Sequence, residues 1–118
     1  MAGIARLIRG GAYLARLDPA KGAEVDKLRL VVVLTGQFLL DMRPPHVFVC
    51  PLSGRSDPDY QALHLSLPAR DSLKVQSYAL VEHCRAISIR RLQSDRLAKL
   101  EIDELNEIIR RLNRLLGW

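Results

Sequence analysis

The order of apolar and polar residues predicts a series of short strands followed by one helix. Residues 11–17 form the first strand, and Asp18-Pro19 ends it because proline has no N–H to donate to a strand ladder. Residues 19–28 are polar and predict a loop. Residues 29–35 are nearly all apolar and rich in valine, which indicates a central strand that is covered on both faces.

Further elements follow at short intervals. Residues 37–42 predict a short helical turn, and Arg43-Pro44-Pro45 breaks it. The next strand, 46–52, ends at the polar segment 53–58, whose glycine and proline are typical of a loop.

Two later segments also have the pattern of strands. The alternation over 61–67 predicts a half-buried strand. Its leucines are expected on one face and its polar residues on the other: Leu63, Leu65 and Leu67 against His64 and Ser66. Residues 77–89 predict either one long strand or two, with a bend near His83.

The C-terminal segment changes to a helical period. Apolar residues recur at helical spacing between Ile102 and Leu116. Asp103 and Glu104 lie at its start and arginines toward its end, which suits the helix dipole. Together the elements predict an α+β protein: a small, strongly curved antiparallel sheet or barrel with a C-terminal helix packed on it.

Composition limits the number of domains and the location. A chain of 118 residues suits a single domain over residues 1–118, and 5% aromatic residues imply a core of Leu, Val and Ile. No apolar run approaches the length of a membrane span, and the N-terminal residues lack a signal-peptide pattern, so we expect a cytoplasmic protein with no membrane association. The net charge of +5 favours polyanions such as nucleic acid, although many basic proteins bind none.

Cysteines and histidines are spaced unlike those of metal or redox sites. Cys50 and Cys84 lie far apart in apolar runs, so we expect buried, reduced thiols. His46, His64 and His83 are scattered, and neither cysteine has a histidine at ligand spacing. The pattern therefore predicts neither a metal nor a cofactor.

Two groups of polar residues are candidates for chemistry. Glu24 and Arg29 flank the end of the polar loop, and Ser53 follows the next long strand, a set that suits metal-free phosphodiester cleavage. By spacing alone, an acid and an arginine five residues apart on a loop are more typical of a solvated ion pair than of a catalytic site. The second group is Glu82-His83-Cys84-Arg85, in which His83 and Arg85 would share one face of a strand, with His83 as an acid or base or as a structural residue.

These segments, in this order, resemble the MazF/PemK (Kid) family of bacterial toxin endoribonucleases. The similarity covers about residues 9 to 116. Its motifs correspond to Arg9-Gly10-Gly11-Ala12-Tyr13, Asp18-Pro19-Ala20-Lys21-Gly22-Ala23-Glu24, Arg29-Leu30-Val31-Val32-Val33-Leu34, Val49-Cys50-Pro51-Leu52-Ser53, Ala79-Leu80-Val81-Glu82-His83-Cys84-Arg85-Ala86-Ile87 and Asp103-Glu104-Leu105.

The resemblance implies an SH3-like curved barrel, a homodimer, and metal-independent cleavage of single-stranded RNA to 2′,3′-cyclic phosphate and 5′-hydroxyl ends. It also implies a cognate antitoxin whose acidic C-terminal segment neutralises the toxin. The family's catalytic positions correspond to Glu24, Arg29 and Ser53. We expect RNA contacts from Lys21, Lys27, Arg55, Glu82, His83 and Arg85.

Four positions depart from the family pattern. Gly11 stands for an acid, Leu30 for a proline, Ser53 for a threonine and His83 for a glutamine. Two alternative functions on the same fold stay open: a gyrase poison like CcdB without nuclease activity, and a degenerate member that only binds an antitoxin.

Overall fold

The structure, a computed structural model, describes residues 6–17 and 28–118. Its strands are β1 (Gly11–Arg16), β2 (Leu28–Val33), β3 (His46–Ser53), β4 (His64–Leu67), β5 (Ser77–Leu80), β6 (Arg85–Ser88) and β7 (Ala98–Lys99). The helices are α1 (Gln37–Leu40) and α2 (Ile102–Leu115), and the 3₁₀ turns are η1 (Pro58–Tyr60), η2 (Val81–His83) and η3 (Ile89–Arg91).

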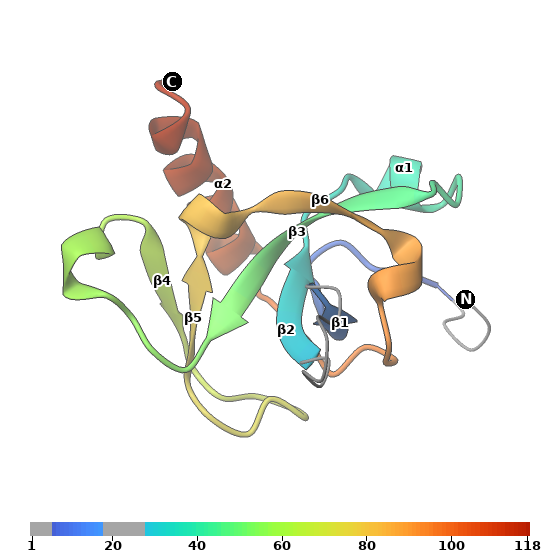
Figure 1. Ribbon diagram of the computed structural model, residues 1–118, viewed down its shortest axis with the longest axis horizontal. Helices are drawn as coiled ribbons and strands as arrows, with labels where there is room; N and C mark the ends of the chain where they lie inside the picture. The colour runs from blue at the N-terminus through green and yellow to red at the C-terminus, as the bar shows by residue number, and fades with distance from the viewer. Residues whose placement is uncertain (1–5, 18–27) are drawn as a thin grey trace, which may run out of the picture.

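All the strand pairs are antiparallel and join in one curved sheet (Figure 1). The order is β4-β5-β3-β2-β1-β7, and β6 also pairs with β3. One edge of β3 therefore has two partners in succession: β6, where Val49 faces Arg85, and β5, where Leu52 faces Ala79. The turn η2 interrupts the chain between these two partners. The predicted architecture, a strongly curved antiparallel sheet with a C-terminal helix, is confirmed.

The valine run of β2 is buried on both faces, as its apolar pattern predicts. Val32 belongs to a core cluster that also contains Leu105 and Ile108 of α2. Val31 and Val33 belong to a second cluster on the other face of the strand. The sheet thus has one core on the face that α2 covers and a second core on its opposite face.

Helix α2 is attached to the sheet by polar contacts as well as by its apolar face. A capping box between Glu101 and Glu104 begins the helix. The guanidinium of Arg70 pairs with the Glu104 carboxylate, with Nη2 2.6 Å from Oε2. Further along, Arg111 Nη1 donates to the backbone oxygen of His64 at 2.8 Å. These contacts join the two ends of α2 to the segments around β4.

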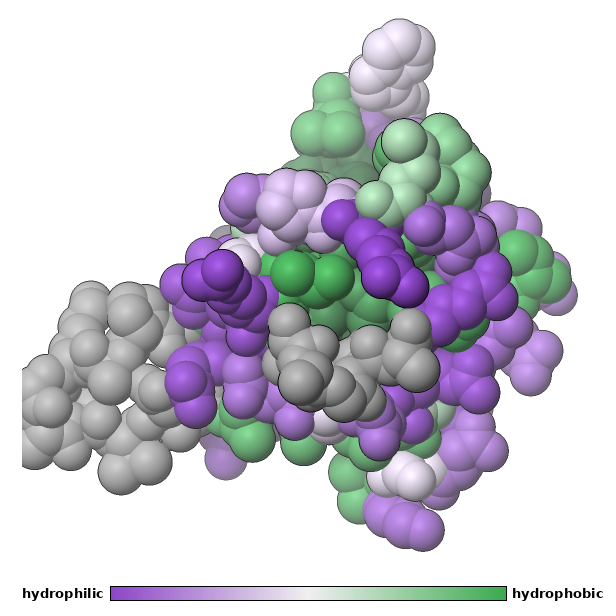
Figure 2. All heavy atoms as spheres, turned by 90° about the vertical axis from the view of Figure 1, so that its right-hand side faces the viewer, coloured by the Kyte–Doolittle hydropathy of each residue, from purple (hydrophilic) through white to green (hydrophobic). Residues whose placement is uncertain are grey.

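The short helix α1 leaves apolar side chains uncovered. Phe38 and Met42, on and just after α1, are 72% and 74% exposed. Figure 2 shows the molecule from this side, where polar side chains make up most of the surface and smaller apolar areas lie between them. Among the described residues, no helix is long and apolar enough to cross a membrane.

Two expectations for the strands need correction. The strand predicted over 61–67 begins only at His64, because η1 and a turn precede it. His64, expected on a solvent face, is buried at 8% exposure, since the turn η2 and the segment after β3 supply contacts that cover it. The segment 77–89 forms two strands, separated by η2 at the expected position near His83.

Candidate functional site

Arg29 and Ser53 lie at the same end of two paired strands. The ladder between β2 and β3 ends at the pair Val31 and Pro51. Arg29 lies two residues before Val31, and Ser53 lies two residues after Pro51. Because the two strands run in opposite directions, both residues lie past the same end of the ladder. Arg29 is also paired with Ala15 of β1 and is exposed. A rigid strand therefore presents this guanidinium at the surface, as phosphate binding requires.

Three of the predicted site residues cannot be placed. Glu24, Lys21 and Lys27 lie outside the described residues. The structure therefore bears only on the other members of the predicted site: Arg29, Ser53, Arg55, Glu82, His83 and Arg85.

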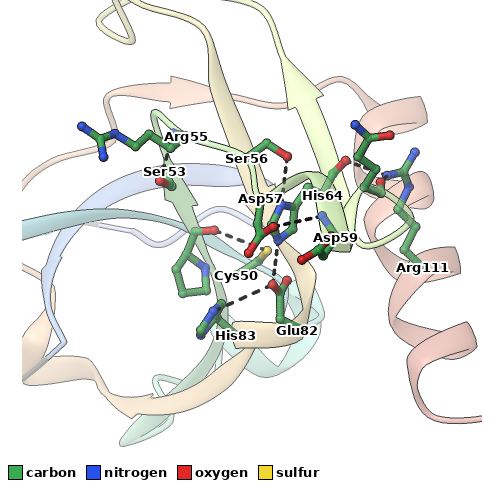
Figure 3. Close-up of polar contacts among 12 residues, drawn as sticks. Cys50, Ser53, Arg55, Ser56, Asp57, Asp59, His64, Glu82, His83 and Arg111 are labelled. Carbon is green, nitrogen blue, oxygen red and sulfur yellow. Dashed lines mark hydrogen bonds and ion pairs between the residues drawn. The ribbon is translucent and has the colours of Figure 1, made fainter.

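The segment after β3 is held by short side-chain to backbone hydrogen bonds. The backbone N–H of Arg55 donates to Ser53 Oγ at 3.1 Å, and the N–H of Asp59 donates to Asp57 Oδ1 at 2.9 Å. The side chain of Arg55 is exposed and points away from His64 (Figure 3). Ser53 and Arg55 thus share one turn, in which the hydroxyl of the first receives the backbone N–H of the second.

The turn η2 carries the second predicted group. Glu82 is 19% exposed, and its Oε2 lies 2.6 Å from His64 Nε2. His83 is 62% exposed, with its Nε2 3.9 Å from the same oxygen, and Arg85 is exposed at the start of β6. Glu82 Oε1 is buried and has no hydrogen-bond partner among the described residues. The turn therefore places His83 and Arg85 toward solvent and Glu82 toward the interior, so Glu82 is a partly buried partner of His64 rather than a fully exposed group.

His64 is the residue that sequence reasoning missed. Its ring contacts both candidate segments, with Nδ1 3.0 Å from Ser56 Oγ and Nε2 beside Glu82 (Figure 3). The alternating pattern around it signalled only a strand. A polar residue on a strand gives no local sign of which distant segment will cover it.

The two cysteines are free thiols, and each shifts the pKa of the other. Cys50 is buried and Cys84 is partly exposed. A hydrogen bond with Cys84, together with burial, raises the pKa of the Cys50 thiol. The hydrogen bond from Cys50 lowers the pKa of Cys84. Cys84 is therefore the thiol of this pair that ionises first.

Within residues 6–17 and 28–118, no three His, Cys, Asp or Glu side chains are grouped so that they could hold a metal ion. The chemistry available to the described site is that of two kinds of group. One is the set of exposed cations, Arg29, Arg55 and Arg85, and the other is hydroxyl and imidazole groups at Ser53 and His83. Such a set suits a polyanion with a reacting phosphate.

Comparison with protein families gives one match. The family described as PemK-like, MazF-like toxin of type II toxin–antitoxin system matches residues 8–116. A comparison with curated protein sequences finds no match.

Solved structures with the same fold include toxins alone and with antitoxins. A chain in the MazE–MazF crystals from Deinococcus radiodurans has a TM-score of 0.77 at 25% identity, covering 92% of this chain and 94% of that one. The Mycobacterium tuberculosis toxin MazF-mt6 has a TM-score of 0.73 at 17% identity, over 91% and 96%. An endoribonuclease in complex with its cognate antitoxin, from a mycobacterial species, has a TM-score of 0.68 at 15% identity, over 97% and 96%.

Proposed function

Because this chain belongs to the family of PemK-like, MazF-like toxins of type II toxin–antitoxin systems, we propose that it is an endoribonuclease. Its substrate is single-stranded RNA, and no metal takes part. The observation that carries the proposal is the family match over residues 8–116. The position of Arg29 and Ser53 at one end of β2 and β3 supports it, because a phosphate can be bound there by a guanidinium and a hydroxyl.

In the proposed reaction, Glu24 accepts the proton of the ribose 2′-hydroxyl. The 2′-oxygen then forms a bond to phosphorus, and the bond from phosphorus to the 5′-oxygen breaks; the electron pair leaves with the 5′-oxygen, which takes a proton from solvent water. Arg29 stabilises the negative charge that develops on the phosphoryl oxygens, and Ser53 orients the phosphate. The products carry a 2′,3′-cyclic phosphate and a 5′-hydroxyl.

The first test is cleavage of a long RNA by the purified chain in the presence of a chelator, with the 5′ ends mapped. Cuts at a repeated short sequence that persist with chelator are the expected result. Arg29→Ala should reduce the rate by roughly 10²–10³-fold, because a preorganised charge-stabilising group is lost. Arg114→Ala, which removes an exposed arginine near the end of α2, should leave the rate unchanged.

Retained cleavage by Arg29→Ala would remove the catalytic assignment of Arg29. Growth arrest without RNA fragments, accompanied by trapped gyrase–DNA complexes, would contradict the nuclease proposal and favour the CcdB-like alternative. Antitoxin binding without either effect would favour a degenerate family member.

The proposal includes two protein partners and a place of action. A cognate antitoxin with an acidic C-terminal segment suits the net charge of +5, and the related toxin of Deinococcus radiodurans is crystallised with MazE. A homodimer is supported by the exposed apolar side chains Phe38 and Met42, since such groups are common at protein interfaces. The substrate places the activity in the cytoplasm.

A further inference from the structure

We propose that His64 is a positioning residue: its buried imidazole holds the two segments that present the RNA-facing groups in one fixed arrangement. This inference rests on the proposed ribonuclease function. The first segment is the turn 53–56 after β3, and the second is η2 with the following Cys84 and Arg85. His64 touches neither the proposed nucleophile nor the phosphate and acts only through these segments.

Both ring nitrogens of His64 are engaged, each by a different segment. Nδ1 lies 3.0 Å from Ser56 Oγ, and Nε2 lies 2.6 Å from Glu82 Oε2 (Figure 3). Its side chain is 3% exposed. A buried imidazole with a partner on each nitrogen has one allowed ring orientation, so the two partners are also fixed relative to each other.

Neither segment is fixed by strand pairing where it meets His64. Ser56 lies beyond the end of β3, and Glu82 lies in η2, where the chain leaves β5 before it enters β6. The groups that would meet RNA are direct neighbours of these contacts: Arg55 precedes Ser56, and His83 follows Glu82. The imidazole therefore supplies a constraint that the ladders do not.

The backbone of His64 is itself well anchored. His64 is paired with Leu80 in the ladder between β4 and β5. Its carbonyl oxygen receives a hydrogen bond from Arg111 at 2.8 Å, and Arg111 is paired with Glu107 one turn earlier on α2. The imidazole thus extends from a position held by both the sheet and the helix.

Removal of the imidazole would release both segments. Glu82 Oε1 already has no hydrogen-bond partner among the described residues, so without His64 the carboxylate would keep only the longer contact of its Oε2 with His83 Nε2, at 3.9 Å. A largely buried carboxylate that has lost its hydrogen bond is unfavourable, and the side chain would move outward to water. That movement would displace η2, and the turn 53–56 would lose the hydrogen bond between Ser56 Oγ and the His64 ring.

The test combines a readout of structure with one of activity. Limited digestion with trypsin reports release of the first segment, because Arg55 lies in it, and amide hydrogen exchange of residues 82–85 reports release of η2. His64→Ala should increase both by roughly tenfold or more, the effect expected on local opening when a hydrogen bond to a charged group is lost. His46→Ala, at an exposed histidine of β3, is the matched control and should change neither.

Single-sided variants separate the two contacts. Ser56→Ala should increase digestion after Arg55 without changing exchange at η2, and should lower kcat because Ser53 loses its position. Glu82→Gln keeps a hydrogen-bonding group of the same size and should leave digestion after Arg55 and exchange at η2 close to the wild type, whereas Glu82→Ala should raise KM through displacement of His83 and Arg85. In the His64→Ala background, Ser56→Ala should have no further effect, since their shared contact is already absent.

Several outcomes would overturn the inference, and they differ from failure of the proposed function. If the wild-type chain cleaves RNA but Ser56→Ala and His64→Ala cleave it equally well despite a released turn, the positioning role is wrong and the nuclease proposal stands. Unchanged digestion after Arg55 and unchanged exchange at η2 in His64→Ala would show that the His64 ring does not hold the two segments in place. Covalent labelling of Ser56 by an organophosphonate would show that the group is a nucleophilic site instead. If the wild-type chain cleaves no RNA, the proposed function fails and the inference fails with it.

Discussion

At the scale of single residues, the departure from the family pattern at Gly11 has a packing explanation. A Cβ atom at position 11 would lie 3.0 Å from the backbone oxygen of Ile8 and 3.0 Å from the Tyr13 ring. The Tyr13 side chain is fully buried, and its hydroxyl receives the N–H of Ile8 at 3.0 Å. The residues before β1 thus fold back against Tyr13, and only glycine leaves room for this contact.

Gly11→Ala should therefore lower the free energy of unfolding by about 1–3 kcal/mol, the range for an added methyl group in a packed site. Gly54→Ala is the matched control, because a Cβ there meets nothing within 4 Å, and it should change stability by less than about 0.5 kcal/mol. Urea unfolding followed by circular dichroism measures both. Equal stability of the two variants would show that the segment before β1 adjusts without cost.

At the scale of elements, Glu104 connects the start of α2 to the rest of the fold. Its Oε1 accepts the backbone N–H of Glu101 at 2.8 Å, which completes the capping box, and its carboxylate pairs with Arg70. The hydrogen bond and charge of Arg70 lower the pKa of Glu104 below its ordinary value of 4.5. Arg70 lies between β4 and β5, so this pair holds the first turn of α2 to the sheet.

We expect Glu104→Gln to cost about 1–3 kcal/mol of unfolding free energy, because Gln can still cap the helix but leaves the Arg70 guanidinium without its carboxylate. Asp103→Asn removes an exposed charge from the same turn and serves as the control. Because the folded pKa of Glu104 is depressed, its contribution is present above about pH 4.5 and is lost as pH falls through the lowered pKa. The difference between wild type and Glu104→Gln should therefore shrink in acid. A difference that stays constant down to pH 2 would contradict the role of this ion pair.

At the scale of the whole molecule, the proposed RNA-binding cations within the described residues come from three separate elements. Arg29 lies on β2, Arg55 follows β3, and Arg85 begins β6, and all three are exposed. Both β2 and β6 pair with β3, so β3 connects the elements that carry these groups. Binding of RNA there should depend on salt, since each phosphate that is neutralised releases counterions.

These three contacts alone should contribute about −2 to the slope with which the logarithm of the association constant for single-stranded RNA falls with the logarithm of salt concentration. Fluorescence anisotropy with an RNA whose 2′-hydroxyls are methylated measures binding without cleavage. Arg55→Ala should make the slope shallower by about 0.7, whereas Arg114→Ala should leave it unchanged. A slope near zero would exclude phosphate contacts as the basis of binding.

Much of the fold follows from local patterns. Strand β2 carries valines on both of its faces, and both faces are buried. The helical period after Ile102 corresponds to α2. The candidate site follows less completely from local patterns in the sequence. The roles of Arg29, Ser53 and His83 stay predictions from the family pattern, and the structure adds that Arg29 and Ser53 lie at one end of β2 and β3. Glu82, also predicted to contact RNA, lies against His64, a contact that the sequence pattern did not indicate.

The sequence by itself determined the longer strands and the C-terminal helix, because the period of two or 3.6 residues in apolar side chains is set by neighbours along the chain. It did not indicate the two-residue strand β7, which is too short to carry a pattern. Tertiary structure alone decided that His64 is buried and that it joins Ser56 to Glu82. Those contacts depend on where η2 separates β5 from β6 along one edge of β3. They also depend on which face of the sheet the turn 53–56 covers. Such choices are made by the register and curvature of the whole sheet, so no local pattern around His64 could have predicted them.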